Sequence, residues 1–137
     1  MTELPNSKNK GNSYIFKNVA TLYDLDRRIE YPLPIDKQDI TVGRFDPEND
    51  QEKADVQIET DDIYMSHIQI HIFITPEDDG YFHEFKTDKN AVNNVFFNGE
   101  EAKKEQGGKY PLENGNLLCL PMTRIIVIDK DRTDKKE

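Results

Sequence analysis

The sequence predicts an all-β protein, a β-sandwich of about 11 short and mainly antiparallel strands. Three observations support this fold class. Short runs of alternating apolar and polar residues recur along the chain. Clusters of Gly, Pro, Asn and Asp separate these runs at intervals of roughly 8 to 12 residues. No segment has the apolar spacing of an amphipathic helix, and 137 residues suit one domain with a buried core.

A strand is expected over residues 68–74, and the rest of the chain is arranged around it. Four isoleucines alternate there with Gln69, His71 and Phe73. This period of two, in a segment rich in β-branched residues, is typical of a half-buried strand. Its register is well determined, because a slip by one residue would expose all four isoleucines. Ser66 and His67 stand at the entry to this strand.

The other expected strands are short and are divided by recognisable turns. They cover residues 14–23, 27–33, 39–44, 55–58, 81–85, 95–97, 117–120 and 125–128. Turns are expected at 24–26, 75–80, 98–99 and 112–115, and Asn98-Gly99 is a strong hairpin signal.

Composition limits the domain organisation and the function classes. Residues 1–12 are expected to be a disordered lead, 13–129 one domain, and 130–137 a charged tail. The net charge of −9 argues against binding to nucleic acid or to anionic membranes, which requires a positive field. No signal peptide or membrane-spanning run is visible, so a cytoplasmic location is expected. Cys119 is the single cysteine, so no internal disulfide can form.

Three polar pairs stand between expected strands. They are Gly43-Arg44, Ser66-His67 and Asn93-Asn94. Loops at one end of a sandwich often meet and form one binding surface. We therefore expect these pairs to lie together.

The order of these pairs resembles the forkhead-associated (FHA) domain, a phosphothreonine-binding β-sandwich. That family has Gly-Arg, then Ser-Arg-x-His, Asp-x-x-Ser-x-Asn-Gly-Thr, Asn-Gly and Leu-x-Asp-Gly-Asp. The corresponding segments here are Gly43-Arg44, Ser66–Gln69, Asp88–Val95, Asn98-Gly99 and Leu112–Asn116. The resemblance extends over roughly residues 14–129 and depends on five motifs in the same order.

The resemblance implies a phosphopeptide-recognition module in Ser/Thr kinase signalling, with no catalysis and no cofactor. Its partner would be a phosphothreonine-containing protein or peptide. The implied binding residues are Arg44, Ser66, His67, Asn93 and Asn94. The planar guanidinium of Arg44 could donate two hydrogen bonds to the phosphate, while Ser66 and His67 could donate short-range hydrogen bonds. Asn93 would hold the main chain of the ligand.

Several positions depart from the family pattern. His67 replaces an arginine, and Gln69 replaces a histidine that braces the binding loops. Val95 replaces a threonine that can contact the phosphate, Ala91 a serine and Asn94 a glycine. These departures predict weak affinity or relaxed discrimination.

Other interpretations of the same residues stay open. Arg44 could pair with Asp46 or Glu48, and Ser66 could cap a turn. His67 could be an ordinary surface histidine, and Asn93-Asn94 could form a tight turn.

The domain as a whole also has alternative functions. The main alternative is a degenerate FHA-like scaffold that binds a partner without phosphate. An enzyme or carbohydrate-binding sandwich has less support, and no metal site is expected. The acidic run Asp61-Asp62 is expected to be a solvated turn.

Overall fold

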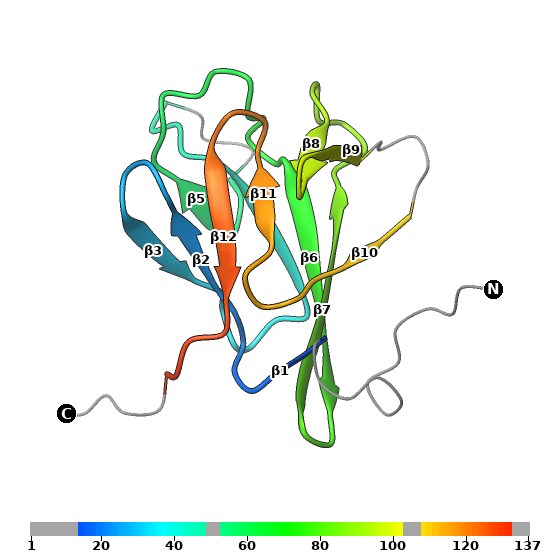
Figure 1. Cartoon of the computed structure of the whole chain (residues 1–137). Helices are drawn as coiled ribbons and strands as arrows, with labels where there is room; N and C mark the ends of the chain where they lie inside the picture. The colour runs from blue at the N-terminus through cyan, green and yellow to red at the C-terminus, as the bar shows by residue number, and fades with distance from the viewer. Residues whose placement is uncertain (1–13, 49–52, 103–107, 133–137) are drawn as a thin grey trace.

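The computed structural model describes residues 14–48, 53–102 and 108–132, which form twelve β-strands and no helix. The strands make two sheets of six that pack face to face (Figure 1). The predicted all-β sandwich is therefore confirmed, with twelve strands in place of about 11. The predicted disordered lead, residues 1–12, lies outside the described residues.

The first sheet contains the central strand. Its order is β1 (Ile15–Phe16), β7 (Gly80–Thr87), β6 (Ile70–Glu77), β4 (Asp39–Arg44) and β5 (Val56–Ile58), and β10 (Tyr110–Pro111) also pairs with β7. Among the described strand pairs, only β4 and β5 are parallel. The second sheet has the order β3 (Ile29–Pro32), β2 (Thr21–Asp24), β12 (Arg124–Ile128), β11 (Leu117–Cys119), β8 (Val95–Phe97) and β9 (Glu100–Ala102).

The core lies between the two sheets. Ile70, Ile72 and Ile74 of β6 are buried, as the alternation predicts. They pack in one cluster with residues of the other sheet such as Leu22 and Val127. Burial of these side chains is the main driving force that holds the sheets together.

The alternation fails at the start of this strand. The ladder begins at Ile70 and not at Ile68, because the chain turns into the sheet only there. Ile68 is half-buried, whereas Gln69 is completely buried. The expectation that Gln69 faces away from the core is therefore wrong.

The segment predicted as one strand over residues 14–23 is two strands in different sheets. β1 pairs with β7, whereas β2 pairs with β12 and β3. The chain crosses between the sheets at residues 17–20. The Asp129 carboxylate accepts hydrogen bonds there from the backbone N–H groups of Lys17 and Asn18.

The turn predicted over residues 75–80 is shorter than expected. Thr75, Pro76 and Glu77 continue β6, and Pro76 lies opposite Tyr81. The ladder with β4 ends at Phe73, and one further hydrogen bond joins the Ile74 N–H to the Gln38 carbonyl oxygen, so no described strand pairs with Pro76 on that side of β6. Pro76 is tolerated because no strand needs its missing N–H group.

The beginning of the predicted charged tail contacts the sandwich. Lys130 pairs with Glu30, and the Arg132 guanidinium donates to the carbonyl oxygens of Val19 and Leu33. Residues 133–137 lie outside the described part of the chain. Among the described residues, no helix is long and apolar enough to cross a bilayer.

Candidate functional site

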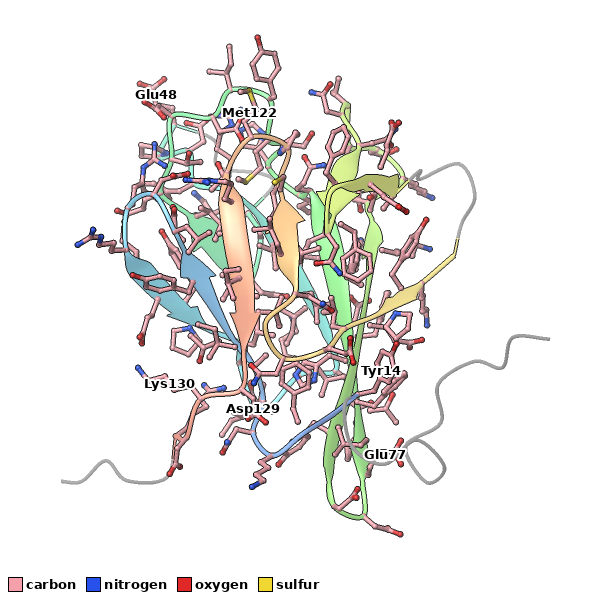
Figure 2. All side chains as sticks on the ribbon, viewed as in Figure 1. Tyr14, Glu48, Glu77, Met122, Asp129 and Lys130 are labelled. Atoms are coloured by element: carbon pink, nitrogen blue, oxygen red, sulfur yellow. The ribbon has the colours of Figure 1, made fainter. Side chains whose placement is uncertain are left out.

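The loops that follow β4, β5, β7 and β11 lie at one end of the sandwich, the upper end in Figure 1. Figure 2 labels Glu48 and Met122 at this end, and Asp129 and Lys130 at the other. Hydrogen bonds join these loops across long separations in the sequence. The structure therefore brings the predicted pairs Gly43-Arg44, Ser66-His67 and Asn93-Asn94 to one end of the molecule.

Gly43 is required because another loop passes directly over it. A Cβ atom at this position would lie 1.9 Å from the His67 carbonyl oxygen and 2.9 Å from that of Ser66. Both distances are shorter than a non-bonded contact allows. The absence of a side chain therefore sets how closely the β5–β6 loop approaches the end of β4.

Arg44 is tied to the same loop by its backbone and its side chain. Its backbone N–H donates to the Ser66 carbonyl oxygen over 3.0 Å, and its Nε donates to the Met65 carbonyl oxygen over 2.8 Å. These bonds fix the guanidinium plane. The Nη1 atom lies 4.0 Å from the Asp46 carboxylate, so the alternative in which Arg44 pairs with Asp46 is present only as a long ion pair.

Asp46 is the main partner of His67. The His67 Nε2 atom lies 2.9 Å from Asp46 Oδ2, and about a quarter of each side chain is exposed. The hydrogen bond from His67 lowers the pKa of the Asp46 carboxyl, helped by the Glu48 N–H group. A carboxylate therefore stands between the two basic side chains predicted to contact a phosphate.

Ser66 connects the β5–β6 loop to the β7–β8 loop. Its Oγ accepts the Val92 N–H over 3.1 Å. The hydroxyl proton of Ser66 is not used in this bond, so it stays available as a donor. The bond runs to a different loop, so Ser66 does more than cap its own turn.

Gln69 links the β5–β6 loop to the β7–β8 loop, a role that the sequence did not predict. Its Oε1 accepts the Ser66 N–H over 2.8 Å, and its Nε2 donates to the Asn93 carbonyl oxygen over 2.7 Å. A side-chain amide carries an acceptor and a donor, so it can satisfy both groups at once. The bracing role attributed to the family histidine is therefore performed here by Gln69.

Asn93 and Asn94 have different neighbours. Asn93 Nδ2 donates to the Tyr64 carbonyl oxygen over 3.1 Å, which adds a second link between the β5–β6 and β7–β8 loops. Asn94 Nδ2 donates to the carboxylate of Glu101 in β9. Val95 is completely buried and begins β8, so its side chain belongs to the core.

Asp62 is a buried carboxylate, and the expectation that it lies in a solvated turn is wrong. Only 8% of this residue is exposed. Its Oδ1 accepts the Tyr64 N–H, and its Oδ2 accepts the Met122 N–H and the Thr123 hydroxyl. Asp62 therefore joins the β5–β6 loop to the β11–β12 loop.

A metal site is not indicated in the described part of the chain. No group of three or more His, Cys, Asp or Glu side chains there is arranged to hold an ion. The arrangement instead offers one guanidinium, one imidazole, one hydroxyl and side-chain amides on cross-linked loops. Such a donor set suits an anionic or hydrogen-bonding ligand.

Comparison with solved structures identifies the fold. The MEK1 FHA domain in complex with a HOP1 phosphothreonine peptide superposes with a TM-score of 0.61 at 20% identity, over 83% of this chain and 99% of that one. The fold is that of FHA domains. An FHA domain of the Chlamydia trachomatis protein CT664 gives 0.59 at 19% identity, over 82% and 98% of the two chains.

A third structure, Mycobacterium tuberculosis EmbR with a low-affinity phosphopeptide, gives 0.59 at 19% identity. It matches over 86% of this chain and 26% of that one. No protein-family model and no curated protein sequence matches this chain. The resemblance found in the motifs thus agrees with the fold, and the sequence is divergent.

Proposed function

We propose that this domain is a binding module, not an enzyme, and that it recognises phosphothreonine-containing segments of a partner protein in Ser/Thr kinase signalling. The observation that carries the proposal is the linked set of Arg44, Ser66 and Asn93. Arg44 ends β4, whereas Ser66 and Asn93 lie in the β5–β6 and β7–β8 loops, and hydrogen bonds hold the three segments together. Two of the solved structures with this fold contain a phosphopeptide, which supports this choice.

The proposed contacts follow from the chemistry of a phosphate. A phosphothreonine carries roughly −1.5 to −2 charges and three acceptor oxygens. Arg44 would donate from its terminal nitrogens, since Nε is already used by Met65. Ser66 would donate its hydroxyl proton, and Asn93 would position the main chain of the peptide.

The Asp46 carboxylate opposes the binding of a phosphate at this site. Its carboxylate lies beside both Arg44 and His67, so a phosphate must displace it or accept a nearby like charge. Once released from Asp46, His67 could donate to the phosphate in its protonated form. Weak affinity is expected, because binding first breaks an existing contact.

A second candidate function is phosphate-independent binding of a partner by the same loop end. Two observations favour it. Asp46 already satisfies His67, and Val95 is buried where the family threonine can reach the phosphate. The two candidates differ in one property, the dependence of binding on the phosphoryl group.

The experiment is a titration with a degenerate phosphothreonine peptide library, its unphosphorylated twin and a phosphoserine version. Binding only of phosphorylated peptides, lost in Arg44→Ala, supports the proposal. Lys37→Ala is the matched control, because it removes a positive charge near the opposite end of β4. Equal binding of the unphosphorylated twin, or an unchanged Arg44→Ala variant, contradicts it.

A further inference from the structure

Exposed apolar side chains gather at the loop end of the sandwich. The described residues include seven large apolar side chains that are exposed. Five of them line two clefts, each of about 400 Å³, and we call these five the apolar platform: Ile63, Tyr64, Val92, Phe96 and Met122. Single exposed apolar residues are ordinary, but a contiguous group of them marks an interaction surface.

The two clefts adjoin each other. Tyr64 and Met122 line both of them. Ile63 lies in the first, whereas Val92 and Phe96 lie in the second. The apolar platform therefore spans the two adjoining clefts, with residues from the β5–β6, β7–β8 and β11–β12 loops and from β8.

The backbone that carries the apolar platform is held in place. The buried Asp62 carboxylate accepts the N–H groups of both Tyr64 and Met122, over 3.0 and 2.9 Å. Asn93 Nδ2 donates to the Tyr64 carbonyl oxygen from the neighbouring loop. A pre-organised surface loses less conformational entropy on binding than a flexible loop does, so this surface is suited to bind a partner.

The surroundings of the apolar platform are acidic. Arg27 pairs with Asp61, and Arg124 pairs with Asp26. Glu101 accepts a hydrogen bond from the Asn94 amide. The charged residues that line the two clefts are four carboxylates, one of which (Asp62) is buried, and one cation: Asp26, Asp61, Asp62, Glu101 and Arg27. The net charge of −9 strengthens the same field.

We propose that the apolar platform docks a segment of a partner protein in which apolar side chains are flanked by Lys or Arg, and that this contact does not require phosphate. The apolar side chains would fill the two clefts, and the basic residues would face the acidic rim. A guanidinium could also stack on the half-exposed Tyr64 ring. A second copy of this chain is a poorer occupant, because a symmetric contact brings the same acidic rims together.

The test uses a phage-displayed library of random unphosphorylated peptides, selected on the full chain. Synthetic versions of the enriched peptides are then titrated by fluorescence anisotropy. Enriched peptides are expected to combine Leu, Ile, Phe or Met with Lys or Arg, and to bind more weakly as salt increases. Ile63→Ser and Met122→Ser are each expected to weaken binding about tenfold.

A matched variant distinguishes the loss of the apolar platform from the loss of any exposed isoleucine. Ile35→Ser is the control for Ile63→Ser, since the two residues are 74% and 75% exposed and Ile35 lies outside both clefts. The selected peptides carry no phosphoryl group, so their binding is measured separately from that of the phosphothreonine peptides. Failure of phosphopeptide binding would therefore not affect this result, and the two proposals can fail separately.

Three outcomes would overturn the proposal. The selection could enrich no peptide, or only acidic ones. The enriched peptides could bind Ile63→Ser as tightly as the native chain. Sedimentation could reveal self-association that Ile63→Ser abolishes, in which case a second copy of the chain occupies the surface.

Discussion

The Gln69 side chain donates from Nε2 to the Asn93 carbonyl oxygen over 2.7 Å, from a position that is completely buried. Its Oε1 accepts the Ser66 N–H at the same time. Gln69→Leu leaves both backbone groups without a partner. We expect a loss of roughly 2–3 kcal/mol in the free energy of unfolding, measured by chemical denaturation.

Gln69→His is the matched variant, because imidazole also offers one donor and one acceptor. It should lose less stability than Gln69→Leu. If Gln69→Leu changes the free energy of unfolding by less than about 0.5 kcal/mol, the amide is not the brace.

Much of the sandwich could be predicted because its strands carry a clear period. Residues 39–44 and 95–97 form strands with the predicted bounds, and the Asn98-Gly99 turn joins β8 to β9. The break between β1 and β2 could not be predicted, since Val19 and Ala20 are buried in the crossing segment and continue the apolar pattern. Periodicity reports burial, but it does not report which sheet a residue joins.

The position of the candidate site could be predicted from the sequence, but the hydrogen bonds between its loops could not. The polar pairs lie together as expected from loops at one end of a sandwich. The roles of Asp46, Asp62 and Gln69 depend on neighbours from other loops. Asp62 and Met122 are 60 residues apart in the sequence, and nothing local distinguishes a buried Asp62 from the exposed Asp61. A buried loop carboxylate is recognised only when its donors are in place.

Asp46→Asn should strengthen binding of a phosphothreonine peptide about tenfold, if the proposed function is correct. The substitution removes the carboxylate that lies 2.9 Å from His67 and 4.0 Å from Arg44 Nη1. Isothermal titration calorimetry gives the affinity. Glu30→Gln is the control, since it removes one carboxylate from a pair with Lys130 that involves none of the site residues. Unchanged or weaker binding would show that Asp46 does not oppose the ligand.

Gly43→Ala should destabilise the domain by roughly 1–3 kcal/mol. The added methyl group would meet the carbonyl oxygens of His67 and Ser66, so the β5–β6 loop must move away from β4. Thermal denaturation and backbone NMR shifts at these two residues would record both effects. Gly108→Ala is the control, because its Cβ would meet no atom within 4 Å. Equal stabilities of the two variants would refute the close approach.

Asp62→Asn should cost about 2 kcal/mol of stability and disturb the apolar platform. One carboxylate oxygen becomes an NH₂ group, which then faces the N–H of Tyr64 or that of Met122. Asp61→Asn is the neighbouring control, with a side chain that is 94% exposed and paired only with Arg27 among the described residues. It should change stability by less than about 1 kcal/mol. Similar losses in both variants would mean that the Asp62 carboxylate is not the link.

His83 should make the domain less stable as the pH falls below neutrality. Burial lowers the pKa of His83 from 6.5 to about 4, and its Nε2 accepts the Ala20 N–H over 3.1 Å. The unfolded chain therefore binds more protons than the folded chain between these two values. The free energy of unfolding should decrease by up to about 3 kcal/mol as the pH falls through this window.

The measurement is an NMR titration of the histidine rings, combined with denaturation at each pH. His71 provides an internal comparison. Burial lowers the pKa of His71, but hydrogen bonds to Asp39 and Asp88 outweigh that effect and raise the pKa above 6.5. As the pH falls through 6.5, the contribution of the His71 imidazolium therefore reaches its full value, so the titration of His71 does not lower the stability between that pH and about 4. A His83 ring that titrates near 6.5 would mean that water reaches it, and the predicted acid sensitivity would then have no source in the core.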